Sequence, residues 1–577
     1  MILWTVQVRW MKTIAIVGLF AALAPDVAAQ DSTRTIDFST TDTLPGDEIP
    51  EPVLRAAIAQ FNAPTTTRTH GTLVVTAGNT IDGTLGIHRG TLRVAGTVRG
   101  NIVVLNGDVR IDDGGRVTGN ILVLGGRIVL APAAIHQGSR REYAGVAPVG
   151  TQPDGTITMR ARRRGLSEYT SASATFVTGP VQTTVRAEAD TYNRVEGLPI
   201  VVGPTLRWRP NEVTAIRLHI AGIVRTAADP DGLRKAFGWR VGLEVARLEP
   251  VPLTLNIDGG SAIVPLVDRA FSSLESGLTA FLMRRDYRDW MNSNGIGVTI
   301  AYRPLPAFTA TLGAHWDRER TVRAVDAFTV LRADEVWRPN PAIDDGDYRT
   351  LGAGLQWDTR DEAARPLSGW LVRGSVQQVA SDKLSPITLP SLVRDDMPTS
   401  GYGSTDIEFD VRRYLRLDPR QAVHVRFAGA GWVGGDPLTV QRRRSMGGAD
   451  PLSGYGFREV TCDRRRRPDP AATALCDRQL LAQVELRRTI DVGINTRLAG
   501  FSLGLEQADL IVLADAGTGW VAGSGAGRVP SSRIQAFDEW LADVGVGIEG
   551  QLFGVYLAKS VTDDDALQLS VRLRRRF

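Results

Sequence analysis

The chain has 577 residues, of which 43% are apolar, 23% charged and 7% aromatic, and its formal net charge is +4. This composition excludes a largely disordered chain, and the near balance of 67 basic and 63 acidic residues gives no nucleic-acid signature, so no nucleic-acid partner is expected. Mean hydropathy is −0.08, and beyond the N-terminal region no apolar run approaches the roughly 18 residues of a membrane-spanning helix. A helical membrane protein is therefore excluded, whereas a transmembrane β-barrel is not.

The first 29 residues are typical of an export signal. The apolar stretch 13–24 follows Lys12, and residues 27–29 supply the small side chains of a cleavage site. An N-terminal anchor helix is the alternative, which the short apolar stretch and Pro25 disfavour. We expect a signal peptide over 1–29 and a protein that works beyond the inner membrane.

A linker over 30–69, with a candidate short helix at about 51–61, precedes a repeat over 70–138. In the repeat, Asn101 and Asn120 recur 19 residues apart within similar segments, GNIVVLNG and GNILVLGG. This period suits one coil of a β-solenoid, with aliphatic side chains stacked inside and Asn and Gly at the corners.

The repeat resembles the bactofilin-type polymer-forming domain, a right-handed β-helix that associates end to end. The resemblance implies self-association through the solenoid as one kind of partner contact. A rigid periplasmic cap or spacer that does not polymerise is the alternative. A second linker, 139–165, separates the repeat from the remaining chain.

Residues 166–577 show apolar and polar side chains alternating with a period of two. Over 480–487, for example, the even positions are apolar while Gln483, Glu485 and Arg487 form the other face. A soluble sandwich also alternates, but its second face seldom needs charged residues on strand after strand. We therefore expect an all-β fold, a transmembrane antiparallel β-barrel of about 16 strands with a charged lumen, preceded by the small solenoid.

Cys462 and Cys476 bracket a polar loop that is rich in Arg and Pro. A disulfide between them fits an oxidising compartment, while free thiols and a metal site are the alternatives. No His lies nearby and two thiols are too few for a closed zinc site, so the disulfide is favoured.

The final segment alternates as a barrel strand does. Leu567, Leu569 and Val571 lie on one face, and the chain ends at Phe577. A terminal aromatic residue on an alternating strand resembles the signal by which bacterial outer-membrane barrels are recognised for insertion. Arg575 interrupts the apolar face, and we expect it to reach towards the membrane interface.

The C-terminal part carries five short motifs that, in this order, resemble the bacterial surface antigen family, the BamA/TamA/FhaC type of outer-membrane barrel. The motif residues are Asp358, Arg360 and Asp361 at a strand start, Gly447, Gly448, Leu452, Gly454 and Tyr455 in a lumen loop, Glu485 and Asp515 as barrel-wall carboxylates, and the segment 544–550. The resemblance implies a protein of the cell outer membrane that inserts or translocates proteins without a cofactor. Its partners would be outer-membrane lipid and unfolded barrel or secreted-protein clients, templated at a seam between the first and last strands.

Two departures from the family pattern stand out. The loop position where the family has an Arg that pairs with the wall carboxylates is Ser453 here. Unpaired carboxylates in a confined lumen are costly, so we predict that Arg458 or Arg444 contacts Glu485 or Asp515 within about 4 Å. In addition, residues 30–69 are too few for the periplasmic POTRA modules of the family, and the solenoid occupies their place.

No catalytic or metal-binding motif is present among the six scattered His residues, so we expect neither an enzyme nor a metal or cofactor. Two other functions compete with protein insertion. One is a structural envelope protein whose barrel anchors a self-associating β-helix, and the other is a passive pore.

Overall fold

The computed structural model describes residues 49–576 except 50, 144–146, 148, 152–153, 160–170, 212, 228–235, 248–250, 267–270, 306, 361–365, 389–395, 419, 449–451, 461, 463–474, 499–500, 525–527, 551–552 and 574. The expected signal peptide, Asp361 and Phe577 lie outside the described residues. The chain forms two compact units, one of Thr41–Arg164 and one that contains Gly165–Phe577. The Gly165–Phe577 part of the second unit begins one residue before the start of the expected barrel at 166.

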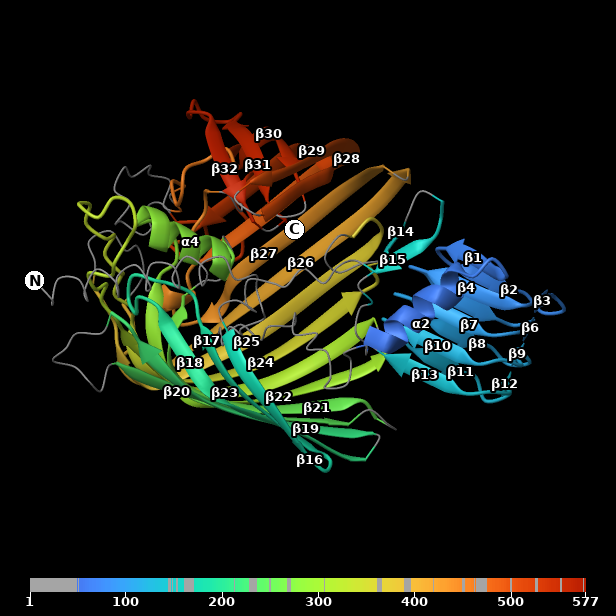
Figure 1. The fold of residues 1–577 in the computed structure, drawn as a ribbon. Helices are drawn as coiled ribbons and strands as arrows, with labels where there is room; N and C mark the ends of the chain where they lie inside the picture. The colour runs from blue at the N-terminus through green and yellow to red at the C-terminus, as the bar shows by residue number, and fades with distance from the viewer. Residues whose placement is uncertain are drawn as a thin grey trace, which may run out of the picture. The chain divides into compact units, whose positions relative to one another are not determined.

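The first unit contains the β-solenoid, which is built from three stacks of parallel strands and makes about four turns (Figure 1). The stacks are β1 (Thr66–His70), β4 (Thr84–His88), β7 (Ile102–Leu105), β10 (Ile121–Leu124) and β13 (Arg140–Tyr143); β2 (Leu73–Val75), β5 (Leu92–Val94), β8 (Val109–Ile111) and β11 (Ile128–Leu130); and β3 (Thr80–Asp82), β6 (Thr97–Arg99), β9 (Arg116–Val117) and β12 (Ile135–His136). The predicted solenoid is confirmed, and its strands extend a few residues beyond 70–138.

The 19-residue period is visible in the solenoid as a ladder of asparagine side chains. Ile121 lies beside Ile102 in the parallel register, and the backbone N–H of Asn120 donates to Oδ1 of Asn101 at 2.9 Å. Ser139 repeats this bond to Asn120 one coil later, also at 2.9 Å. The corner amides of Asn120 and Ser139 are therefore satisfied by the asparagine side chain of the coil before, while the aliphatic residues fill the core.

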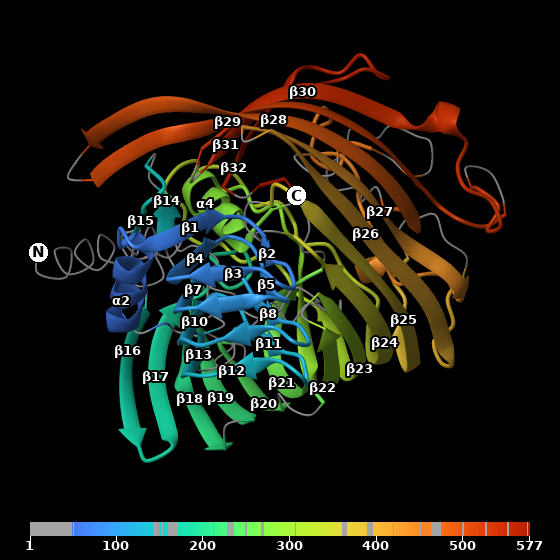
Figure 2. The same cartoon turned by 90° about the vertical axis from the view of Figure 1, so that its right-hand side faces the viewer.

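Helix α2 (Glu51–Asn62) covers the outer face of the five-stranded stack, as Figure 2 shows. Its buried Phe61 packs with Val103 and Leu105 of β7, and a Cβ on Gly86 would lie only 2.9 Å from the Phe61 ring. The hairpin of β14 (Val149–Thr151) and β15 (Ile157–Met159) joins the same cluster. The candidate helix at 51–61 is confirmed.

The second unit is dominated by one antiparallel sheet of 17 strands in sequence order. The strands are β16 (Ser171–Thr178), β17 (Val181–Ala189), β18 (Pro199–Asn211), β19 (Thr214–Arg225), β20 (Phe237–Arg247), β21 (Leu253–Pro265), β22 (Trp290–Leu305), β23 (Phe308–Thr321), β24 (Asp345–Asp358), β25 (Gly369–Ser385), β26 (Tyr402–Asp418), β27 (Gln421–Gly435), β28 (Arg478–Leu498), β29 (Phe501–Trp520), β30 (Leu541–Glu549), β31 (Gly554–Ser560) and β32 (Gln568–Arg572). The described helices of this unit are α4 (Ser273–Met283) and the short 3-10 turns η2 (Val440–Arg442) and η3 (Phe537–Glu539).

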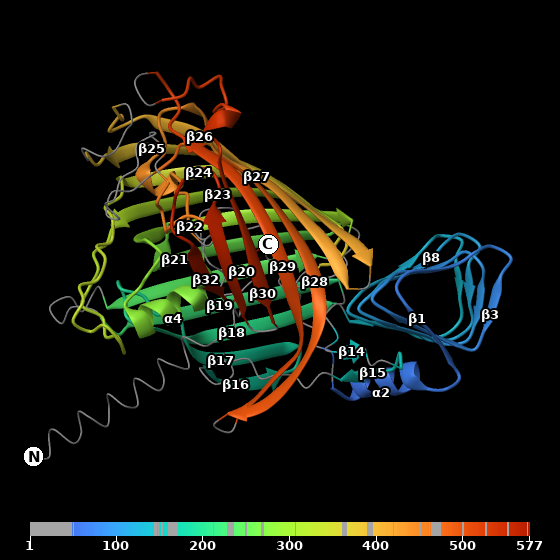
Figure 3. The same cartoon turned by 90° about the horizontal axis from the view of Figure 1, so that it is seen from above.

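The sheet curves, and α4 lies on its concave side (Figures 1 and 3). The expected all-β fold is confirmed, with 17 strands in place of about 16. Among the described residues, no helix is long and apolar enough to cross a membrane.

The two faces of the sheet differ in a way opposite to that of a soluble protein. On β24, Leu351 and Leu355 are 58% and 56% exposed, whereas Thr350 is 5% exposed. Other strands repeat the pattern, with exposed Ile296, Ile300 and Tyr302 on β22, Leu312 and Trp316 on β23, Leu510 and Val512 on β29, and Val544, Val546 and Ile548 on β30. An apolar outer face over a buried polar inner face is typical of strands that cross a membrane as part of a barrel.

The connections between strands are short at one end of the sheet and long at the other. At the short-turn end, five of the eight connections have two residues: 179–180, 212–213, 306–307, 419–420 and 499–500. At the long-loop end, the longest are 266–289, 322–344, 386–401, 436–477 and 521–540. Outer-membrane barrels have this asymmetry, with short periplasmic turns and longer outer loops.

The first and last strands, β16 and β32, are the two ends of the sheet. No pairing between them occurs among the residues that the structure describes. Because the strand count is odd, β16 begins at the long-loop end and β32 finishes at the short-turn end. We refer to the β16 and β32 edges together as the seam.

Candidate functional site

The long connection 436–477 carries the predicted lumen-loop motif, and it is packed rather than extended into solvent. Leu452, Tyr455 and Met446 are each at most 2% exposed, in a cluster that reaches Leu481 of β28. The predicted disulfide between Cys462 and Cys476 is confirmed; it lies in this cluster with a Cα–Cα distance of 5.1 Å.

The glycines of the motif allow the chain to turn and to approach the wall closely. Gly447 and Gly448 have φ of +93° and +117°, a region that favours glycine. At Gly454, a Cβ would lie 2.5 Å from Cβ of Asp543 and 2.7 Å from the backbone of Lys559. Any larger residue there would push the loop away from β30 and β31.

Tyr455 holds the loop tip against the same two strands. The hydroxyl of Ser560 donates to the Tyr455 hydroxyl at 2.8 Å, and Thr562 Oγ1 lies 2.6 Å from it. The loop is therefore anchored on β30 and β31 by a tyrosine and a close glycine contact, without the arginine that the family pattern has at Ser453.

Neither substitute cation contacts the wall carboxylates, so that prediction is wrong. Arg458 pairs with Asp289, and Arg444 pairs with Glu408 at 3.2 Å. The partner of Arg458 lies just before β22, and the partner of Arg444 lies on β26. Being close to Ser453 in the sequence therefore does not place either arginine beside Glu485 or Asp515.

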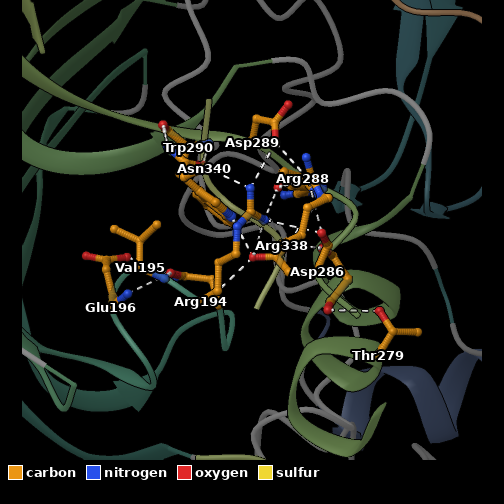
Figure 4. Close-up of polar contacts among 12 residues, drawn as sticks. Arg194, Val195, Glu196, Thr279, Asp286, Arg288, Asp289, Trp290, Arg338 and Asn340 are labelled. Atoms are coloured by element: carbon orange, nitrogen blue, oxygen red, sulfur yellow. Dashed lines mark hydrogen bonds and ion pairs between the residues drawn. The ribbon is translucent and has the colours of Figure 1, made fainter. Parts of the chain in front are cut away.

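Asp289 is the centre of a buried cluster at the long-loop end, shown in Figure 4. It pairs with Arg458, with Arg194 at 2.9 Å and with Arg338 at 2.7 Å. Burial alone would raise the pKa of Asp289, but the three guanidinium groups outweigh that effect and hold the pKa well below its usual range.

Arg194 has no solvent exposure and ties three long connections together. It also pairs with Asp286 at 3.1 Å and donates to the side-chain oxygen of Asn340 at 3.0 Å. An apolar cluster surrounds these contacts, formed by Tyr192, Leu198, Ala280, Phe281, Ala327 and Trp337. We call the Arg194–Asp289 contacts and this cluster the loop knot. No local sequence pattern indicates the loop knot, because the partners of Arg194 lie about 90 and 150 residues away.

The wall carboxylates are neutralised by the segment that follows β32. Arg576 pairs with Glu485 at 3.2 Å and also with Asp515, and the side chains of both carboxylates have no exposure. Arg487, two positions from Glu485 on β28, pairs with Glu485 at 2.7 Å. The cation that the loop lacks is thus supplied by residue 576, which sequence motifs did not indicate.

Arg575 also faces the interior, so the expectation that it reaches the membrane interface is wrong. It pairs with Asp509 at 2.8 Å and with Glu549 at 2.6 Å, and its side chain is 15% exposed. Strand β32 ends at Arg572, so the strict alternation that would direct residue 575 outward no longer applies beyond it.

Helix α4 contacts the end of β32 through one carboxylate. Glu275 accepts from Nε of Arg572 at 3.0 Å and from the backbone N–H of Leu573 at 2.6 Å. The same carboxylate accepts from the backbone N–H of Ser272, as part of a capping box that starts the helix. The sequence S-x-x-E at 272–275 was the available signal for this helix.

The strand-start motif is a local feature. Arg360 donates to the carboxylate of Asp358 at 2.9 and 2.7 Å, two residues away on the connection after β24. Its described contacts do not bring it to the wall carboxylates. Among the described residues, no group of three or more His, Cys, Asp or Glu could hold a metal ion.

No family model matches the chain, and no curated protein matches it in sequence. The chain is distantly similar to solved structures of BamA from Haemophilus ducreyi lacking POTRA domains 1–3 (12% identity, TM-score 0.39, 73% of this chain and 80% of that chain) and of CdiB from Acinetobacter baumannii (10% identity, TM-score 0.30, 74% and 71%). A third is CdiB from Escherichia coli, with 11% identity, a TM-score of 0.31 and coverage of 74% and 66%.

Proposed function

We propose that the chain is an outer-membrane barrel that inserts or translocates polypeptides by binding them at the seam, without enzymatic chemistry or a cofactor. The observation that carries the proposal is a sheet with an apolar outer face in which, among the described residues, the edge strands β16 and β32 do not pair with each other. The motif order that resembles the bacterial surface antigen family supports it.

An open seam in lipid has a physical consequence. Backbone N–H and C=O groups on a strand edge cannot find water in the hydrocarbon core, and each unsatisfied group costs several kcal/mol. An incoming strand that pairs with β16 or β32 would satisfy those groups. The seam would therefore bind extended segments largely through the main chain, with limited regard for their sequence.

The two rival functions, a passive pore and a structural envelope protein, are weighed by different features of the chain. The lumen loop packs on β28 through buried residues such as Leu452 and Tyr455, an anchoring that a passive pore does not require. The structural rival depends on self-association of the solenoid. We propose that the solenoid lies in the periplasm, as the place of the POTRA modules in the family suggests.

The test places a photo-crosslinking residue at positions on the outer face. Phe176 on β16 and Leu569 on β32 are 60% and 68% exposed on the two seam edges, and Leu351 on β24 is a matched mid-sheet control at 58%. In growing cells we expect crosslinks to newly made polypeptides at positions 176 and 569 but not at 351. Equal crosslinking at all three positions would contradict the proposal.

The crosslinked chains also distinguish the two activities. Partners that are outer-membrane barrels indicate insertion, and secreted proteins indicate translocation. A quantitative comparison of the outer-membrane proteome and the secretome, with and without this protein, should show a selective loss of the same set.

A further inference from the structure

The residues after β32 occupy a site lined with acids. We call Glu485 and Arg487 of β28, Asp509 and Asp515 of β29, and Glu549 of β30 the wall site. Three arginines of the 572–576 segment enter the acid-lined region: Arg576 and Arg575 bind in the wall site, and Arg572 binds the α4 residue Glu275. Together these groups bring five carboxylates against the three arginines of the segment.

The wall site contains a single arginine of its own. Arg487 pairs with Glu485 at 2.7 Å, with Glu549 at 3.2 Å and with Asp509 at 3.7 Å. With Glu275 included, five carboxyl groups thus face one guanidinium group when the segment is left out of the count. Arg572, Arg575 and Arg576 bring three further guanidinium groups to these carboxyls.

Burial makes the guanidinium partners important. The side chains of Glu485 and Asp515 have no exposure, and those of Glu549 and Glu275 are 5% and 4% exposed. Carboxylates so far from water are costly without a paired cation, and removing one partner of such a pair is strongly destabilising. The site therefore requires a cationic ligand, and it discriminates against neutral or acidic ones.

The contacts also define the shape of the ligand. Glu275 binds the Arg572 side chain and the next backbone N–H, that of Leu573, so part of the recognition is of the main chain. The arginines that bind stand at relative positions 0, +3 and +4. A ligand with the same spacing would reach the α4 carboxylate and both parts of the wall site.

The segment is held by a short strand. Strand β32 has five residues and, within the described part of the chain, pairs with β31 alone, whereas β28 has 21 residues. A short edge strand opens at a lower free-energy cost than a long central one. The ion pairs are consequently a large share of what retains the segment in the site.

We propose that the wall site with Glu275 is a docking site for the arginine-bearing end of an extended polypeptide, and that residues 572–576 occupy it as an internal ligand. This inference rests on the proposed function, because the external ligand would be a client segment. An incoming basic strand end would exchange with the internal segment, which frees the β32 edge at the same time. Clients would accordingly carry a basic, not an acidic, terminal strand.

Direct binding to the purified full chain in detergent tests the proposal. The probe is a fluorescent peptide with the sequence of residues 566–577, and the control peptide has Gln in place of Arg572, Arg575 and Arg576. The proteins are the wild type, the variant Arg575→Gln/Arg576→Gln, and the same variant with Glu485→Gln and Asp515→Asn added.

We expect the Arg575→Gln/Arg576→Gln variant to bind the probe at least about tenfold more tightly than the wild type, since its own segment no longer competes. The control peptide should bind weakly, the added Glu485→Gln and Asp515→Asn should abolish the gain, and affinity should fall as salt rises. Equal binding of the two peptides, or equal affinity of wild type and variant, would overturn the proposal.

A second measurement needs no variant. A probe with a photo-crosslinker at the position of Leu573 should label the wild-type chain on β28–β30 or α4 at high peptide concentration, and labelling confined to other segments would sink the proposal. Peptide binding is measured without insertion, so its loss with intact crosslinks at positions 176 and 569 would remove this inference and leave the proposed function. The converse result would remove the proposed function and leave the wall site as a peptide-binding site without a client.

Discussion

At the scale of single residues, Arg576 supplies the wall carboxylates with the cation that the family pattern places at the lumen-loop position of Ser453. One guanidinium contacts Glu485 and Asp515, which lie on neighbouring strands. The loop tip is close to the same place, because Gly454 packs on Asp543 and Asp543 lies directly opposite Asp515 in the β29–β30 register. Arg576 therefore supplies a cation to the part of the wall beside which Ser453 and Gly454 lie.

Removing this cation should be costly. We expect Arg576→Gln to lower the free energy of unfolding by about 3–5 kcal/mol, because it leaves buried carboxylates without their partner. Ser453→Arg in the same background should recover part of the loss, since the loop tip is adjacent. Denaturant unfolding in detergent measures both.

The matched control is Arg349→Gln, whose partner Asp382 is 72% exposed at the surface. Such an exposed pair contributes at most about 1 kcal/mol. If Arg576→Gln were no more destabilising than Arg349→Gln, the role assigned to residue 576 would be wrong.

At the scale of elements, helix α4 connects a loop between β21 and β22 to the last strand. Glu275 caps the helix through Ser272 and binds Arg572, a residue 297 positions away. Burial alone would raise the pKa of Glu275, but Arg572 and the N–H groups of Ser272 and Leu573 outweigh burial and lower it. The ionised form of Glu275 therefore stabilises the contact between α4 and β32.

The sign of the pH dependence follows from this direction. A carboxyl whose pKa is lower in the folded than in the unfolded state contributes stability above the unfolded pKa, about 4.3 for Glu, and loses it as pH falls through the folded value. At neutral pH, Glu275→Gln should therefore lower the free energy of unfolding relative to wild type. This difference should shrink below about pH 4. Glu335→Gln, at a half-exposed pair with Arg285, should show no such difference.

The elements differ in how far the sequence predicts them. The strand alternation, the 19-residue repeat and the cysteine pair are local patterns, and all three are confirmed. The capping box at Ser272 is local as well, but it lies between strands in a stretch that alternation does not describe. Pairs such as Arg194 with Asp289, or Arg576 with Glu485, join residues about 90 positions apart, and no local pattern fixes which of many arginines meets which carboxylate.

At the scale of the whole molecule, the odd strand count separates the two ends of the sheet. The chain enters β16 at the long-loop end and leaves β32 at the short-turn end. If the short turns face the periplasm, β16 begins at the outer end of the sheet and β32 finishes at the periplasmic end.

Labelling of single cysteines with a membrane-impermeant maleimide tests this topology. The native cysteines are in a disulfide, so Ser524→Cys on a long loop, Arg420→Cys on a short turn and Val129→Cys on the solenoid would each report one site. We expect Ser524→Cys to react in intact cells, and the other two only after the outer membrane is permeabilised. Labelling of Val129→Cys in intact cells would place the solenoid on the cell surface and contradict its periplasmic location. Labelling of Arg420→Cys in intact cells would reverse the orientation of the whole sheet.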